Sequence, residues 1–327
     1  MSKCFALLVL LISVVAATSA LAGTFKRVTR PECQYSLEGN ISADDVKAIK
    51  AAIHLTNRGF GPTVCLNSPT GGSWTAAIEI AKFFRRGVGT YIGDGAECFS
   101  ACAIIFMAGI VDENPEEPDG KLLKRTLHVH GNLGFHAPFV QGEGRTAEDA
   151  ATSYRSAVKS ISALIELGAI EPSLLVEMNK YGPDKYFNID TVDKVGRWRI
   201  ALAGYHKPSA INRSMSNIAC KNVTGWDDGA NPSVIKKPIQ FPCTDRCTIV
   251  QPYRDAHRNL TGERHFHVIS NYGGSTCVVT ITTKGTLSAS YSFTDSNGKL
   301  PEAPNGELYG WEYSLPDTPL RKLSAGD

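Results

Sequence analysis

The stretch that decides the fold is PTVCLNSPTGG, Pro62–Gly72, together with the segment SWTAAIEIAKFFRRG that follows it to Gly87. The first half of Pro62–Gly72 predicts a buried strand, and the second half has the composition of a turn. The next segment repeats apolar residues at helical spacing, so the unit is a strand, a turn and a helix. The apolar face of that helix contains Trp74, Ala77, Ile78, Ala81 and Phe84.

Similar units lie on both sides of this stretch. Upstream, residues 35–39 predict a short strand, and Ser42 is placed to cap a helix that ends by Gly59. Downstream, residues 89–93 predict a strand, and the apolar run Ala101–Ala108 predicts a short buried helix. Strands that alternate with helices are typical of a parallel sheet covered on its faces, so we expect an α/β fold.

Further along, Leu133–Phe135 predicts a strand that ends at His136. Thr146 and Asp149 have the spacing of a capping box, which predicts a long helix ending at Gly168. A shorter helix is expected at residues 173–180. Four apolar residues recur at helical spacing along the long helix, namely Tyr154, Val158, Ile161 and Ile165.

After about residue 205 the pattern becomes that of antiparallel strands. Alternating runs at 265–270, 277–282 and 286–293 are separated by glycine-containing turns, which are hairpin signals. We therefore expect two domains, residues 23–205 and residues 206–327, the second of them smaller, β-rich and disulfide-containing.

Residues 1–22 have the pattern of a secretory signal. Lys3 precedes the apolar run Phe5–Ala17, and small residues follow up to Ala22. We expect cleavage between Ala22 and Gly23 and a periplasmic or secreted protein. No other window is long and apolar enough to span a bilayer, so no membrane anchor is expected after processing.

Composition excludes nucleic-acid binding by bulk charge, because 34 Lys and Arg face 32 Asp and Glu, for a formal net charge of +2. Of nine cysteines, Cys4 leaves with the signal. An even number then remains, and in an exported chain that predicts disulfides. Four of the remaining cysteines precede residue 205 and four follow it, so each domain can form its own disulfides. The sequence does not specify which cysteines pair.

Ser100 is the candidate nucleophile. It lies between the glycine-containing turn 93–97 and the apolar helix that begins at Ala101, where N–H groups favour negative charge. A serine hydrolase needs such a serine on a sharp turn, a base, a group that orients the base, and N–H donors for the oxyanion. Serine in this position also serves simply as a helix N-cap, so Ser100 alone does not specify an enzyme.

Four motifs, in their order along the chain, resemble the proteolytic subunit of Clp proteases. They are Leu66–Gly72, Gly89–Gly93, Cys98–Ala103 with the apolar run to Gly109, and Gly134–Pro138. The chain is similar to an exported branch of the ClpP/crotonase superfamily over about residues 35–202. This resemblance implies a ClpP/crotonase-like fold of repeated β-β-α units and a serine peptidase that acts on a peptide or protein substrate.

The resemblance also implies roles for particular residues. Ser100 would be the nucleophile and His136 the general base. The acid of the triad would be Asp184, with Asp190 and Asp193 as alternatives. The oxyanion hole would be formed by the N–H groups of Ala101 and of Gly71 or Gly72. The chain departs from the family pattern where Thr70 is inserted before the two glycines, where cysteines flank the serine, and where Ala137 replaces a glutamine.

Partners follow from the same resemblance. Relatives form rings or stacks, so a homo-oligomer formed through residues 146–167 is expected. The ATPase partner of Clp proteases is not expected in a periplasm without ATP. No cofactor and no metal are expected for this chemistry.

Other functions remain open from the residues. A Ser–Lys pair would need Lys180 or Lys185. A second alternative is a non-enzymatic binding or scaffolding protein that keeps the fold without a working triad. A third, a crotonase-type enzyme acting on acyl thioesters, is disfavoured because coenzyme A chemistry belongs in the cytoplasm. A metal site is not expected at His128 and His130, where the sequence shows no cysteine or carboxylate partner, and Cys243 with Cys247 is expected to form disulfides rather than a zinc site.

Overall fold

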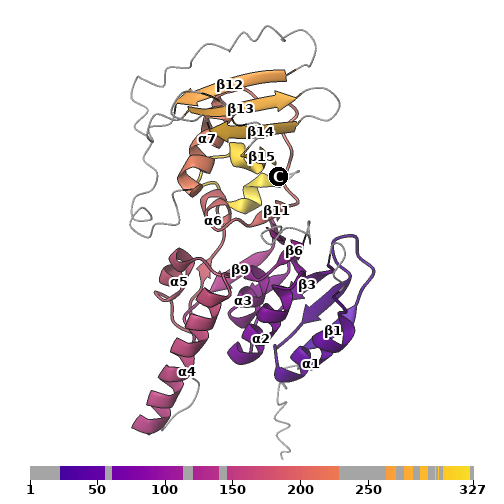
Figure 1. The fold of residues 1–327 in the computed structure, drawn as a ribbon, viewed down its shortest axis with the longest axis vertical. Coiled ribbons are helices and arrows are strands. Elements are labelled where there is room, and N and C mark those ends of the chain that lie inside the picture. The colour runs from indigo at the N-terminus through magenta and orange to yellow at the C-terminus, as the bar shows by residue number, and fades with distance from the viewer. Residues whose placement is uncertain are drawn as a thin grey trace, which may run out of the picture.

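The computed structural model describes most of the chain as a mixed α/β protein (Figure 1). The described residues are 23–55, 61–112, 121–139, 146–227, 263–269, 276–282, 288–293, 299, 301 and 305–324. The predicted signal at residues 1–22 lies outside them. Within the described residues, no helix combines the length and the hydropathy that a membrane span requires.

The largest sheet has six strands, and all but the first of them run parallel. Its order is β1-β2-β3-β4-β8-β11, with β1 antiparallel to β2. The strands are β1 (Thr24–Arg27), β2 (Tyr35–Glu38), β3 (Thr63–Asn67), β4 (Gly89–Ile92), β8 (Arg125–His128) and β11 (Ala201–Ala203). The sequence prediction of strand–helix units around a parallel sheet is confirmed.

A second, three-stranded sheet lies at the end of β3. It consists of β10 (Phe187–Asn188), β9 (Asn132–Phe135) and β5 (Glu97–Phe99), with β5 parallel to β9. An isolated bridge between Ser68 and Cys98 joins the residue after β3 to β5. The carboxyl ends of β3, β5 and β9 are therefore neighbours.

Helices pack against these sheets. Ser42 caps α1 as predicted, in a capping box with Asp45, and the predicted capping box of Thr146 with Asp149 is present before α4. Every residue of α3 is buried, as its sequence predicts, and α1, α2 and α3 pack side by side (Figure 1). The helices are α1 (Ala43–Ala52), α2 (Trp74–Phe84), α3 (Ala101–Met107), α4 (Ala147–Glu166), α5 (Pro172–Met178) and α6 (Val192–Arg197).

Arg125, at the start of β8, ties the ends of several helices together. Its buried guanidinium donates to four carbonyl oxygens at 2.5 to 3.3 Å, those of Met107, Ala169, Trp198 and Arg199. Burial lowers the pKa of Arg125 to about 9, so the group keeps its charge at neutral pH. Carbonyl oxygens at helix ends carry partial negative charge, which suits a buried cation.

The C-terminal part contains a four-stranded antiparallel sheet in the order β12-β13-β14-β15. The predicted hairpins are thus confirmed, whereas the helix α7, which packs on this sheet, was not predicted. The elements are α7 (Arg213–Asp227), β12 (Glu263–Ile269), β13 (Thr276–Thr282), β14 (Ser288–Phe293) and β15 (Gly306–Leu308). A small hairpin elsewhere, β6 (Ile110–Asp112) with β7 (Lys121–Leu123), completes the strands described.

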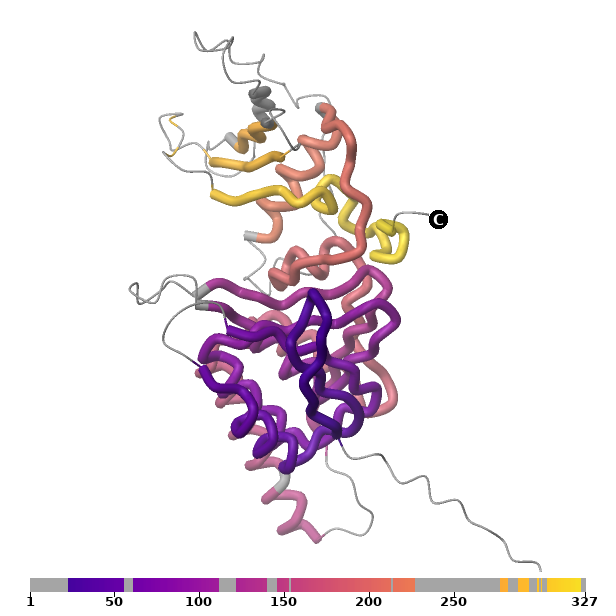
Figure 2. The backbone as a smooth tube through the Cα atoms, turned by 90° about the vertical axis from the view of Figure 1, so that its right-hand side faces the viewer, coloured from indigo at the N-terminus to yellow at the C-terminus, as the bar shows by residue number. Residues whose placement is uncertain are grey.

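The hydrophobic core is divided into two clusters, one around the six-stranded sheet and one between α7 and β13. Two short 3-10 turns that follow β15, Trp311–Tyr313 and Leu320–Leu323, lie between the two parts (Figures 1 and 2). Trp311 and Leu320 belong to the first cluster, whereas Tyr313 belongs to the second. The domain boundary near residue 205 stays a prediction, because residues far beyond it return to the first core.

Three disulfides are present among the described residues, which confirms the expected use of cysteine. They join Cys33 to Cys65, Cys98 to Cys102 and Cys220 to Cys277. None of these bridges crosses residue 205. Cys243 and Cys247 lie outside the described residues.

Candidate active site

Ser100 occupies a sharp turn between β5 and α3. Its backbone has φ 57° and ψ −121°, a conformation that residues with a side chain rarely adopt. Such a conformation costs about 1–3 kcal/mol and is found mainly at functional sites. The side chain makes no cap hydrogen bond to α3. The simple role of a helix N-cap therefore does not account for Ser100, and the backbone matches the strained elbow that exposes a nucleophile.

The elbow is held from both sides. The Ser100 N–H donates to the Gly134 carbonyl oxygen at 3.1 Å, and the Ser100 carbonyl accepts from the Ala103 N–H at 3.0 Å. The disulfide between Cys98 and Cys102 connects the residues that flank the elbow. The candidate nucleophile thus lies on a small, covalently closed loop.

The glycine turn lies directly against this elbow. Gly71 has φ +68°, and a Cβ atom on it would sit 2.7 Å from both the Phe99 carbonyl oxygen and the Ser100 Cβ. The same atom would sit 3.0 Å from the Ala101 nitrogen. Only glycine fits such an approach at this φ value. The insertion of Thr70 therefore leaves the turn next to Ser100.

Of the two glycines, Gly72 has the N–H group that is available. Gly72 is paired with Ile41 in an isolated parallel bridge, whose two hydrogen bonds involve the neighbours of Gly72. The Ile41 N–H donates to the Gly71 carbonyl and the Ser73 N–H donates to the Ile41 carbonyl, each at 2.8 Å. The Gly71 N–H already donates a hydrogen bond to the Ser68 carbonyl oxygen at 3.3 Å. Across the described residues, neither the Gly72 N–H nor the Ala101 N–H makes a hydrogen bond. These two donors are free to bind a developing oxyanion.

His136 directly follows β9 and is 3% exposed. Its Nδ1 lies 2.6 Å from the carbonyl oxygen of Ala137. A carbonyl oxygen only accepts hydrogen bonds, so Nδ1 carries the proton and Nε2 of the neutral ring has the free lone pair. This is the tautomer that a general base requires.

Ser100 and His136 lie at the same edge of the small sheet. In the parallel pairing of β5 with β9, Phe99 is opposite Gly134, so both candidates follow the carboxyl ends of neighbouring strands. The ring of Tyr186 lies 4.7 Å from that of Phe99 and 5.3 Å from that of His136. In the described conformation no hydrogen bond joins Ser100 and His136 directly. Such bonds are often long in unliganded sites and shorten in the substrate complex.

The structure does not bring Asp184 into contact with the base through a hydrogen bond. Its side chain is exposed, and among the described residues no hydrogen bond joins it to His136. The role implied for Asp184 stays a prediction. The alternatives Asp190 and Asp193 are held in ion pairs with residues of α6, Lys194 at 2.6 Å and Arg197 at 3.0 Å.

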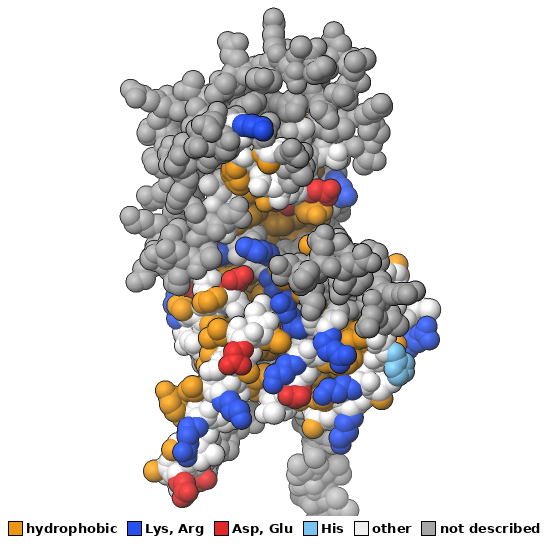
Figure 3. Space-filling view, viewed as in Figure 1, with side chains coloured by type: hydrophobic (Ala, Val, Ile, Leu, Met, Phe, Trp, Pro, Cys, Tyr) orange, Lys and Arg blue, Asp and Glu red, His pale blue; other side chains and the backbone are white. Residues whose placement is uncertain are grey.

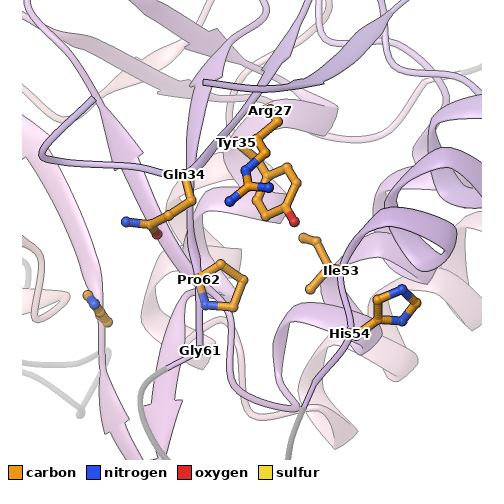
Figure 4. A pocket seen from close by; sticks show the side chains of 8 residues that line it. Arg27, Gln34, Tyr35, Ile53, His54, Gly61 and Pro62 are labelled. Carbon is orange, nitrogen blue, oxygen red and sulfur yellow. The ribbon is translucent and has the colours of Figure 1, made fainter. Parts of the chain in front are cut away.

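A pocket of about 430 Å³ lies at the opposite end of β3 from the glycine turn. It is open to solvent, and Figure 4 shows side chains from β1, β2 and the end of α1 around it. The lining includes Arg27, Tyr35, His54, Pro62 and Lys124. Because Pro62 precedes β3 and Ser68 follows it, this pocket is separate from the Ser100 site.

The sequence interpretation of His128 and His130 needs correction. His130 lies in a turn after β8 rather than in the strand, and a carboxylate partner is present, since Asp94 is close to both rings. The sequence does not indicate this partner, because Asp94 follows β4, which is distant from His128 in sequence but adjacent to β8 in the sheet.

Comparison with protein-family models found no match to this chain, and comparison with curated proteins found none either.

Proposed function

We propose that this protein is an exported serine hydrolase with a ClpP/crotonase-like fold, and that it acts as a peptidase on peptide or protein substrates. The observation that carries the proposal is the backbone of Ser100, at φ 57° and ψ −121° between a strand and a buried helix. Strain of about 1–3 kcal/mol is retained where function needs it, and no capping bond offsets it here.

The sheet arrangement supports the fold assignment. A parallel sheet is accompanied by a small second sheet that carries the residues before Ser100 and His136. Three of the four motifs that resemble Clp proteases, those at Leu66–Gly72, Cys98–Ala103 and Gly134–Pro138, lie where β3, β5 and β9 end, which supports the resemblance. The predicted signal at residues 1–22 and the disulfides support a periplasmic or secreted location, where no ATP-dependent partner is expected.

The chemistry follows from the free groups of the site. Nε2 of His136 takes the proton of the Ser100 hydroxyl as Oγ attacks the scissile carbonyl carbon. The carbonyl π electrons move onto its oxygen, which the N–H groups of Gly72 and Ala101 stabilise. His136 then protonates the leaving amine as the C–N bond breaks, giving an acyl-enzyme. Water, deprotonated by His136, hydrolyses this ester and restores Ser100.

The Ala137 carbonyl takes the orienting role in the described conformation. It fixes the proton on Nδ1, as the carboxylate of a triad does, through a hydrogen bond of 2.6 Å. A carbonyl stabilises the imidazolium less than a carboxylate because it carries no full charge. Asp184 would add that charge only if it approached His136 when substrate binds.

Self-association is part of the proposal. The helix α4 exposes the apolar residues that recur along it, Tyr154 at 72%, Val158 at 45% and Ile165 at 51% exposed. Figure 3 shows hydrophobic side chains among charged ones over this helix. Apolar side chains in a row at helical spacing are typical of a surface that binds another chain.

A second candidate is a binding or scaffolding protein that keeps this fold without catalysis. Two observations favour it, namely the absence of a Ser100–His136 hydrogen bond in the described conformation and the absence of a carboxylate on His136 in the same residues. A fluorophosphonate probe separates the two functions because it reacts only with an activated serine.

The test compares the processed chain with three variants. We expect labelling of the wild type, none of Ser100→Ala, labelling at least about 100-fold slower for His136→Gln, and unchanged labelling for Ser156→Ala, which alters an exposed serine of α4. Cleavage of a denatured protein, followed through the new N-termini, then checks for a peptidase. Equal labelling of wild type and Ser100→Ala would exclude Ser100 as nucleophile. A folded but unlabelled wild type would favour the scaffolding function.

A further inference from the structure

Asp94, His128 and His130 form a cluster apart from the Ser100 site. Asp94 lies in the turn after β4, His128 is the last residue of β8, and His130 follows two residues later. Since β4 and β8 are neighbouring parallel strands, their carboxyl ends bring the three side chains together. All three can offer ligand atoms that lie within 4.8 Å of one another.

The distances from Asp94 to the two imidazoles also suit a bound metal ion. The Asp94 carboxylate oxygen Oδ1 lies 3.6 Å from Nδ1 of His128 and 3.3 Å from Nδ1 of His130. Among the described residues, no hydrogen bond joins this carboxylate to either ring. Ligand atoms bound at about 2.0–2.1 Å to a tetrahedral zinc ion lie about 3.4 Å apart. The separations from Asp94 are therefore close to the edge of such a tetrahedron.

The ring of His128 is oriented toward the cluster. Its Nε2 lies against Gly204, where there is no room for even a Cβ atom, so Nδ1 is the nitrogen directed at Asp94. The His130 backbone N–H points at the same Nδ1 at 3.3 Å, a long hydrogen bond that a metal bond would replace. The side chain of His128 is 17% exposed, whereas those of His130 and Asp94 are 39% and 71% exposed. Metal ions can therefore enter from solvent.

We propose that Asp94, His128 and His130 bind a divalent transition-metal ion, with Zn²⁺ as the best fit. Two imidazoles and one carboxylate suit zinc, copper or nickel, whereas magnesium and calcium prefer oxygen ligands alone. Three protein ligands leave one tetrahedral position for water. The ion would cross-link the turn after β4 to the end of β8 beside Gly204, where the chain leaves the six-stranded sheet.

The test is titration calorimetry of the processed chain with Zn²⁺ alone, after removal of metals with a chelator. We expect one high-affinity Zn²⁺ per chain, and a loss of affinity of at least tenfold in both Asp94→Asn and His130→Gln. The matched control is His54→Gln, a histidine of the pocket at the end of α1, which should bind as the wild type does. Thermal melting without metal shows whether each variant is folded.

Two further measurements keep the proposal open to refutation. Cys243→Ser with Cys247→Ser removes the other zinc candidate of the sequence and should leave the affinity unchanged. Co²⁺ in place of Zn²⁺ should give the visible absorption of a tetrahedral site with nitrogen and oxygen ligands, and His130→Gln should lose it. The proposal would be overturned if the wild type bound no Zn²⁺, or if Asp94→Asn and His130→Gln bound Zn²⁺ as tightly as the wild type. A loss of affinity only in the double cysteine variant would also overturn it.

Discussion

A methyl group on the Cα of Gly71 would lie 2.7 Å from the Cβ of Ser100, so the glycine turn and the elbow at Ser100 are in direct contact. Gly71→Ala should therefore displace the elbow as well as strain the turn. Gly95 has a similar φ, +64° against +68°, but nothing lies within 4 Å of an added Cβ.

Gly95→Ala is thus a matched control for the backbone cost alone. We expect each variant to lose about 1–2 kcal/mol of unfolding free energy from the positive φ. Gly71→Ala should lose more, together with most fluorophosphonate labelling, whereas Gly95→Ala should keep its labelling. Equal labelling of both variants would show that the turn does not position Ser100.

The disulfide that flanks Ser100 should affect activity more than stability. Cys98 and Cys102 are four residues apart, whereas Cys33 and Cys65 are 32 apart. Loop-closure entropy gives about 2 kcal/mol for the short loop and about 4 kcal/mol for the long one. Replacement of both cysteines by alanine should thus cost less stability at 98 and 102 but should slow labelling at Ser100 more. Urea unfolding and labelling rates measured on both double variants check this opposite ranking.

Asp184→Asn discriminates between two ways of orienting the base. Because the Ala137 carbonyl already holds Nδ1 of His136, we expect the labelling rate to fall less than tenfold. A triad in which Asp184 is required would lose about 10⁴-fold. Asp44→Asn, which breaks an exposed ion pair with Lys47 on α1, is the control for a general effect of losing a carboxylate.

Glu312 should make stability depend on pH. Burial raises its pKa from 4.5 to about 7, although the N–H groups of Tyr309 and Gly310 donate to the carboxylate at 2.9 Å and partly oppose the rise. Between these pH values the folded chain keeps a proton that the unfolded chain has lost. Stability should therefore fall as pH rises from about 4.5 to about 7, by up to about 3 kcal/mol.

Glu312→Gln removes this titration and keeps an oxygen acceptor. The difference in unfolding free energy between wild type and variant, measured by urea unfolding across this pH range, cancels the contributions of other groups. A difference that does not change with pH would contradict the raised pKa of Glu312.

Local signals explain the part of the fold that the sequence predicted. The strand–turn–helix unit at β3 and α2, the capping box before α4 and the buried helix α3 each depend on residues within one segment. The elements β5 and β10 were not predicted because they are only three and two residues long and form by pairing with β9. The apolar residues along α4 were predicted as a helical pattern, but periodicity did not show that most of them face solvent.

The candidate site was predictable in its residue types rather than in its contacts. The turn composition located Gly71 and Gly72 and the apolar run located Ser100, because these are local features. The partner of His136 Nδ1 is a backbone carbonyl, which leaves no mark in a side-chain pattern. The approach of Asp94 to His128 required the pairing of β4 with β8, which only the assembled sheet defines.

Trp311 and Leu320 complete a core whose other members are almost all encoded before residue 205. The Leu320 N–H donates to the Asp190 carbonyl at 2.9 Å, and the His206 N–H donates to the Leu323 carbonyl at 2.7 Å. A nascent chain that has reached only residue 205 therefore lacks part of its own interior. The interior around the six-stranded sheet is thus closed only when the last twenty or so residues of the chain are in place, and a protein truncated before Trp311 should expose apolar surface there.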